Sequence, residues 1–156
     1  MLRSEYNIEG LVRAKKEFLL ILNKFPGELV HKEFIGSWGI CEVVAHLIEW
    51  DEATIVLISE VLAGKTPQWI EDIDDFNKHA VLLWKESGWD KLLSVFDITS
   101  KKVINQYRGV PKYLRQKFIW PDKDITISEM VMIDISHHKN DHLPGIKKFL
   151  RDNRII

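Results

Sequence analysis

The sequence predicts an all-α protein built as an up-down four-helix bundle. Three observations predict this fold. Apolar residues recur at helical spacing in four long segments, and modest loops with glycine and proline separate those segments. The sequence also contains no internal repeat. The 156 residues fit a single domain, 1–156, that is large enough to bury a sizeable core. In such bundles, ligand and metal sites are built from side chains on facing helices.

The first two predicted helices have clear ends. The first runs from Ile8 to Phe25 and stops at the pair Pro26-Gly27. The second runs from about Gly39 to Ala63, and Gly64 follows it as a C-terminal stop. His46 falls inside the apolar stripe of this second helix, so we expect it to face the core or a cavity within it.

The second half of the chain contains the other helical segments. Helical patterns over residues 74–85 and 89–107 flank the breaker Ser87-Gly88, and they are compatible with two helices or with one long kinked helix. A loop with Phe118–Pro121 precedes the last helix, which opens with the capping box Thr126–Glu129. Pro144 should kink this last helix or start a fresh short one.

Composition and charge exclude several classes of partner. Hydrophobic residues make up 46% of the chain, charged residues 29%, and the net charge is −1, so no basic field exists to attract nucleic acid or an anionic membrane. Residues 1–5 carry charges where a signal peptide needs apolar residues, and no stretch reaches a membrane-spanning length. The single cysteine, Cys41, rules out an internal disulfide and a thiolate zinc knuckle. We therefore expect a cytoplasmic protein.

Three histidines are the candidate metal ligands. His138 and His142 are four residues apart, so on an α-helix they share one face, and His46 could add a third imidazole from a facing helix. Three neutral imidazoles with one open position form the ligand set of a catalytic divalent metal. Spacing alone equally allows that the pair sits on a polar helix edge. His137 lies about 100° around the helix from His138 and is expected to face elsewhere.

Residues near these histidines are the candidate catalytic and pocket groups. Asp134 lies four residues before His138, on its face, and could hold a ligand imidazole or act as a base. Glu49 and Asp141 could serve in the same roles. All three carboxylates could also be ordinary exposed groups. Trp50 follows His46 by one helical turn and is placed beside the predicted cavity.

Two stretches resemble a known family. Residues 36–52 (GSWGICEVVAHLIEWDE) and 138–146 (HKNDHLPGI) are similar to the signature stretches of the DinB/YfiT-like superfamily, and the loops at 64–67 and 118–121 are most similar to its ClbS/DfsB family. The resemblance covers the chain from Ile8 to Leu150. It implies an up-down four-helix bundle with crossed connectivity. It also implies a divalent metal, zinc or nickel, on His46, His138 and His142, although some members bind no metal detectably.

The resemblance also suggests a range of activities. Members of the superfamily include thiol-dependent S-transferases, an isomerase and metal hydrolases, and the ClbS/DfsB family takes its name from a self-protection protein against a reactive genotoxin. This chain departs from the pattern at Gly39, where the family usually has a Ser or Thr cap, and at Ser136 and Lys139, where aromatic residues are common. These departures leave any inherited substrate preference open.

The leading expectation is a metal-dependent hydrolase or S-transferase that acts on a small reactive molecule, in detoxification or self-protection. Three neutral ligands would leave the charge of the metal uncompensated, which acidifies a bound water or thiol. One alternative is a non-catalytic bundle that sequesters a small hydrophobic molecule without metal. A further alternative is a dimerising module that uses exposed apolar residues, so both a monomer and a homodimer are open.

Overall fold

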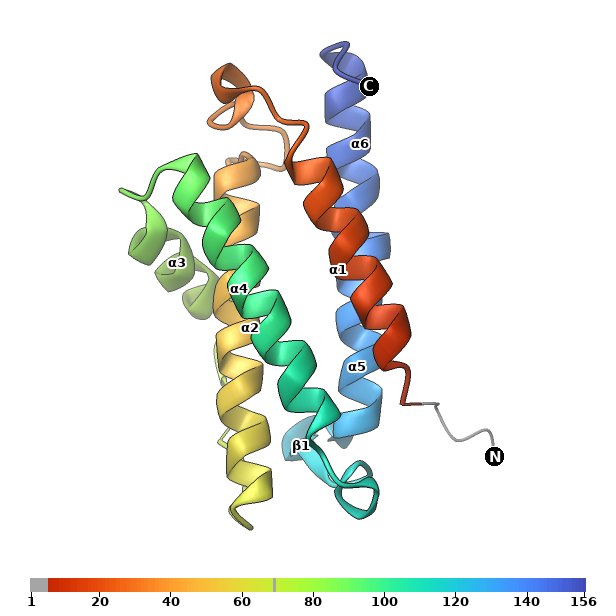
Figure 1. The fold of residues 1–156 in the computed structure, drawn as a ribbon. Helices are drawn as coiled ribbons and strands as arrows, with labels where there is room; N and C mark the ends of the chain where they lie inside the picture. The colour runs from red at the N-terminus through yellow and green to blue at the C-terminus, as the bar shows by residue number, and fades with distance from the viewer. Residues whose placement is uncertain (1–5, 69) are drawn as a thin grey trace.

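The computed structural model describes residues 6–68 and 70–156, most of which are helical (Figure 1). The charged segment 1–5, used above to argue against a signal peptide, lies outside the described residues. The α-helices are α1 (Ile8–Leu22), α2 (Ile40–Leu62), α3 (Ile73–Trp84), α4 (Trp89–Arg108), α5 (Ile127–Ser136) and α6 (Leu143–Asp152). The all-α prediction is confirmed. None of the helices in the described part of the chain has the length and apolar character needed to cross a bilayer.

The connections differ in length: residues 85–88 join α3 to α4, whereas the longer segments 23–39 and 109–126 join α1 to α2 and α4 to α5. Single 3₁₀ turns occur at Gly27–Leu29, Lys112–Leu114 and Pro121–Lys123. The expected loop at 118–121 includes strand β1 (Phe118–Trp120), which pairs antiparallel with β2 (Ile125–Thr126). Asp124, in the left-handed region with φ of 53°, closes the turn between the strands. Strands of two and three residues are too short to show an alternating pattern, which is why the sequence indicates only a loop.

Local signals set most helix boundaries. Helix α1 ends at Leu22, three residues before the predicted end, because the chain turns ahead of Pro26. The segment 74–107 forms two helices, α3 and α4, since Gly88 is the N-cap at the start of α4. The predicted capping box is present in α5: Thr126 Oγ1 accepts from the backbone N–H of Glu129, whose carboxylate accepts from the N–H of Thr126.

The helices pack in a simple arrangement. Helix α2 packs against α4 and against the short α3, whereas α1 packs against α4 and α5. In Figure 1, α2 and α4 run side by side, and α1 runs beside the α5–α6 segment, with the β1 hairpin at the end where α4 stops and α5 starts. Between α5 and α6 the helix continues as a π-helical turn over His137–His142.

A band of buried polar residues divides the core. One apolar cluster contains Phe18, Ile48 and Phe96, and the other contains Leu11, Ile58, Val103 and Val131. Between them the helices contribute buried polar residues, which we call the polar layer: Lys15, Asp51, Thr54, Thr99, Ser100 and His138. Each end of the core is apolar, so the layer needs internal partners for its charges.

Candidate metal centre

The π turn determines which histidines meet. Its hydrogen bonds join residues five apart, as the backbone N–H of Leu143 shows by donating to the carbonyl of His138. Pro144 follows directly, in the first turn of α6, where its missing N–H is tolerated. Residues five apart therefore share a face here, and the rings of His137 and His142 lie with centroids 4.4 Å apart.

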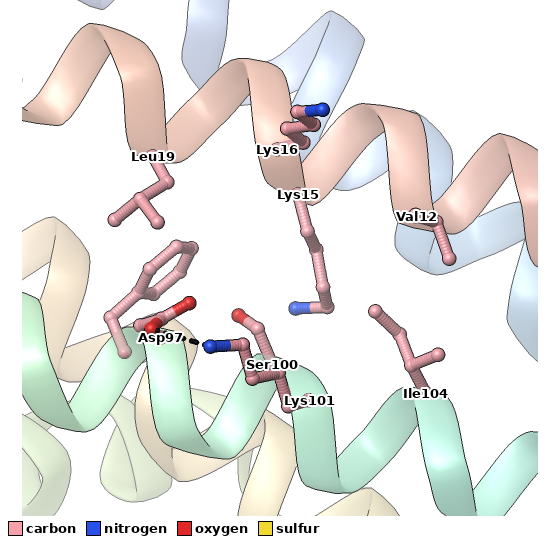
Figure 2. Close-up of a pocket in the computed structure, with 9 residues that line it drawn as sticks. Val12, Lys15, Lys16, Leu19, Asp97, Ser100, Lys101 and Ile104 are labelled. Carbon is pink, nitrogen blue, oxygen red and sulfur yellow. Dashed lines mark hydrogen bonds and ion pairs between the residues drawn. The ribbon is translucent and has the colours of Figure 1, made fainter.

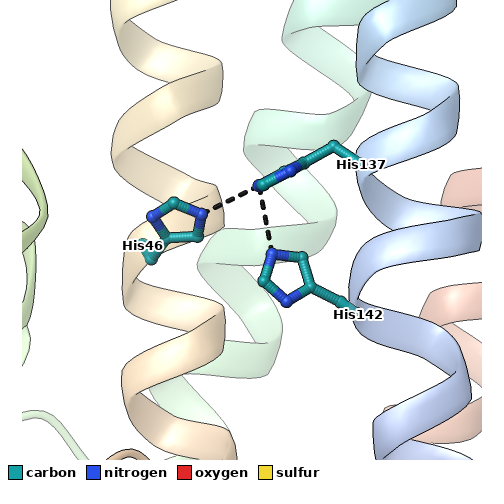
Figure 3. A group of neighbouring side chains, drawn as sticks. All are labelled: His46, His137 and His142. Atoms are coloured by element: carbon teal, nitrogen blue, oxygen red, sulfur yellow. Dashed lines mark hydrogen bonds between the residues drawn. The ribbon is translucent and has the colours of Figure 1, made fainter. Parts of the chain in front are cut away.

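Three histidines converge at this turn (Figure 3). His46 projects from α2 toward the π turn, and its Nε2 lies 2.9 Å from Nε2 of His137. His142 Nε2 lies 3.0 Å from the same nitrogen. One ligand atom from each of these residues lies within 4.8 Å of the others, which is close enough for one metal ion. His46 is buried, whereas the other two are half-buried, so the group is accessible from one side.

The structure does not bring His138, the expected third ligand, into this group. Its Nδ1 lies 2.8 Å from the backbone carbonyl of Asp134, so Nδ1 carries the proton, and its Nε2 lies 3.2 Å from Nζ of Lys15. The ring is 3% exposed and packs edge-on against Phe18. Both ring nitrogens are thus engaged inside the core. This grouping differs from the expected one because the four-residue rule holds for an α-helix, whereas the π turn places His137 beside His142.

The protonation state of His46 follows from its neighbours. The indole N–H of Trp50 can only donate, and it donates to Asn77 Oδ1 at 3.0 Å. The same oxygen lies 2.7 Å from Nδ1 of His46, so Nδ1 must carry the proton. The Nε2 of His46 therefore presents a lone pair toward His137. Trp50, expected beside the cavity, also helps to orient this ring through Asn77.

His137 is oriented in the same way. Its Nδ1 lies 3.1 Å from a carboxylate oxygen of Asp141, so this nitrogen donates and Nε2 of the neutral ring carries a lone pair. Two lone pairs then face each other across the 2.9 Å that separates His46 from His137. Such a contact is repulsive unless a cation, either a proton or a metal ion, lies between the nitrogens.

His46 and His142 have lowered pKa values. Burial, with repulsion from His137, lowers the pKa of His46 to about 4, and burial with repulsion from His137 and His46 lowers the pKa of His142 to about 3. Both rings are neutral near pH 7 and so are available as ligands. Metal-bound histidines usually donate their second N–H to a carboxylate or carbonyl, as His46 and His137 do here.

The donor set fits a divalent transition metal. With metal–nitrogen bonds of about 2.0–2.1 Å, a tetrahedral ion separates its ligand nitrogens by about 3.3 Å. The two Nε2 separations of 2.9 and 3.0 Å need to open by only a few tenths of an ångström. Three neutral nitrogens also leave the fourth position free, as in catalytic zinc sites.

A small cavity adjoins His137. It has a volume of about 120 Å³, and His137 and Asp134 line it with the apolar and aromatic residues Trp50, Ile73, Trp120, Met130 and Ile133. Asp134 Oδ2 accepts a 2.6 Å hydrogen bond from the hydroxyl of Tyr107. Burial raises the pKa of Asp134 to about 7, against the lowering effect of that hydrogen bond. A carboxyl group with this pKa can accept or release a proton near neutrality.

The other expected catalytic carboxylate has a different partner. Glu49 accepts a 2.8 Å hydrogen bond from the indole N–H of Trp84, which joins α2 to α3. Asp141, weighed as a similar candidate, contacts His137 directly. No local pattern predicts that Asn77 lies near His46, because the two residues lie on different helices. Pro144, two residues after His142, was the one signal that the last helix is irregular.

Comparisons with known protein families, with curated proteins and with solved structures find no match to this chain.

Proposed function

We propose that this protein is a metal-dependent enzyme that acts on a small reactive molecule, with His46, His137 and His142 as the metal ligands. The observation that carries the proposal is the convergence of Nε2 lone pairs whose ring orientations are fixed by Asn77 and Asp141. We further propose that the helices form an up-down four-helix bundle of the DinB/YfiT-like type, ClbS/DfsB family, with α3 as an addition on α2. The sequence resemblance supports this assignment, with His137 taking the place of His138.

The cavity residues suggest the roles of the protein groups. Zinc or nickel on three neutral imidazoles would supply the positive charge that acidifies a bound water or thiol. Asp134 is the proposed general acid–base group, because its carboxyl lines the same cavity as His137 and has a pKa of about 7. Trp50 and Trp120 would bind the apolar part of the substrate. These features support hydrolysis or thiol transfer on a small molecule.

The test is metal content, measured by plasma mass spectrometry on untagged protein purified without chelator. We expect near-stoichiometric zinc or nickel in the parent, loss of that metal in His137→Ala, and retention in His138→Ala. Circular dichroism on each variant separates loss of metal from loss of fold. Metal loss in His138→Ala with retention in His137→Ala would contradict the proposed ligand set.

A second candidate function is metal-free sequestration of a small hydrophobic molecule. The predominantly apolar walls of the 120 Å³ cavity favour it, and a proton could then lie between His46 and His137. A parent protein that holds no metal and takes up none on titration, but binds an apolar ligand in the presence of chelator, would support this function over the first.

A further inference from the structure

A second cavity lies between α1 and α4 (Figure 2). Its volume is about 210 Å³, and its walls include Val12, Lys15, Leu19, Phe96, Ser100 and Ile104. In Figure 2 the side chain of Lys15 extends from α1 toward the part of α4 that carries Ser100. The cavity therefore opens onto the polar layer and contains none of the histidines of the candidate metal centre.

Ser100 has an unused hydroxyl in this wall. Its side chain is 6% exposed, and its Oγ has no hydrogen-bond partner among the described residues. The neighbouring Thr99 instead bonds back to the carbonyl of Phe96 at 3.2 Å. A buried hydroxyl without a partner is costly, so a polar atom inside the cavity would stabilise it.

Lys15 offers a second donor to the same space. Its ammonium group has three N–H donors, and two of them have partners in Asp51, at 2.7 Å, and His138, at 3.2 Å. Among the described residues the ammonium has no third hydrogen-bond partner, and Lys15 lines the cavity with its Nζ 5.5 Å from the centre of the Phe96 ring. Two donors on facing helices, Lys15 and Ser100, match an oxygen that has two lone pairs.

The local charge favours a neutral ligand. The positive charge of Lys15 is already balanced by Asp51, and both side chains are almost completely buried. Two further lysines line the cavity, but Lys16 is exposed, and the exposed Lys101 pairs with Asp97. An anion bound beside Ser100 would therefore have no buried cation to balance it. The volume also sets a size, because a cavity of about 150 Å³ can hold benzene. A molecule slightly larger than benzene with a single carbonyl oxygen fits both requirements.

We propose that the α1–α4 cavity is a binding site for a small, neutral, mainly apolar carbonyl compound, whose oxygen accepts from Lys15 and Ser100. The apolar residues Leu19, Phe96 and Ile104 contact the body of the ligand. This site is separate from the candidate metal centre, and its occupancy does not depend on metal.

Fluorine NMR titration of the full chain tests the site with two matched probes. One probe is para-fluoroacetophenone, and the other is para-fluoroisopropenylbenzene, in which a methylene group replaces the carbonyl oxygen. We expect the ketone to bind more tightly to the parent. Ser100→Ala should weaken ketone binding about two- to tenfold and leave the hydrocarbon unchanged, because a single hydrogen bond is removed. Leu19→Trp should fill the cavity and weaken both probes.

His137→Ala is the control that separates this site from the metal centre, and it should bind both probes as the parent does. The proposal is overturned if neither probe binds at millimolar concentration, since the cavity then holds only water. It is also overturned if Ser100→Ala weakens both probes equally, or if Leu19→Trp, shown to be folded by circular dichroism, binds them unchanged.

Discussion

His137 and His138 are neighbours in the chain, yet their rings have different partners. His137 meets His46 and His142 beside a partly open cavity, whereas His138 meets Lys15 inside the polar layer. The sequence predicts two of the three converging histidines, His46 from its place on an apolar stripe and His142 from its four-residue spacing to His138. The spacing predicts His138 as the third member, whereas the structure places His137 there, because the helix changes its hydrogen-bond register at that point.

Asp134 should make stability depend on pH in a specific way. Its pKa is about 7 in the folded protein and about 4 in an unfolded chain, so the folded state holds a proton that the unfolded state releases between these values. The contribution of Asp134 is therefore full below about pH 4 and is lost as the pH rises toward 7, by up to about 1.4 kcal/mol per pH unit.

The matched variant is Asp134→Asn, which can still accept from Tyr107 and does not titrate. Urea unfolding from pH 4 to 8 should show the parent losing stability relative to the variant up to about pH 7, with a constant difference above it. The histidines with lowered pKa values also make stability depend on pH. Their contribution cancels in this comparison because both proteins contain them. A difference that does not vary with pH would contradict the raised pKa.

Helix ends were the most predictable elements, because capping depends on a few adjacent residues. The box at Thr126 and the breaker at Gly88 were readable from the sequence and are present in the structure. The π turn was not, because it depends on how the last helix accommodates Pro144 while packing against α1. The sequence pattern alone does not separate α3 from α4, since it fits both one kinked helix and two helices.

Gly39 shows how tertiary contacts override a capping preference. Serine is usually a better N-cap than glycine by a few tenths of a kcal/mol. A Cβ atom at Gly39, however, would lie 2.9 Å from the backbone oxygen of Lys32 and 3.3 Å from that of Val30. Gly39→Ser should therefore destabilise the protein by about 1–3 kcal/mol in urea unfolding.

The control for this substitution is the other glycine cap, at α4. Nothing lies within 4 Å of a Cβ atom at Gly88, so Gly88→Ser should be neutral or stabilise by a few tenths of a kcal/mol. If Gly39→Ser were as stable as Gly88→Ser, the contact between the new Cβ atom and the backbone oxygen of Lys32 would not be destabilising.

Across the whole molecule, the polar layer links helices that are distant in sequence. Lys15 and Asp51 are separated by 36 residues, and their 2.7 Å ion pair is almost fully buried. The sequence does not predict this pair, because a lone lysine in a helical pattern gives no local sign of a buried partner. Long-range pairing of this kind is the part of the fold that the sequence did not reveal.

Breaking this pair should be costly, whereas replacing it should not. Lys15→Met leaves Asp51 buried without its cation and should lower the free energy of unfolding by about 3–5 kcal/mol. The double variant Lys15→Met/Asp51→Leu should recover most of that loss. Lys16→Met, on the exposed side of α1, is the control and should change stability by less than about 0.5 kcal/mol. If Lys15→Met were as stable as the parent, Asp51 would not depend on the charge of Lys15.

The π turn has a consequence for insertions and deletions in this helix. A turn bonded five residues apart contains one residue more than an α-helical turn, so removal of one residue can restore a regular helix without rotating the segments on either side. Deletion of Lys139, whose side chain is exposed, would leave His137 and His142 four positions apart on one α-helical face. This deletion is combined with Pro144→Ala, because a proline would disrupt the regular helix. We expect the combined variant to keep the proposed metal binding. Deletion of Met132 within α5 would rotate the histidines by about 100° and abolish it. On this view the His137–His142 pair is a standard four-residue ligand pair lengthened by an insertion that the backbone absorbs within a single turn.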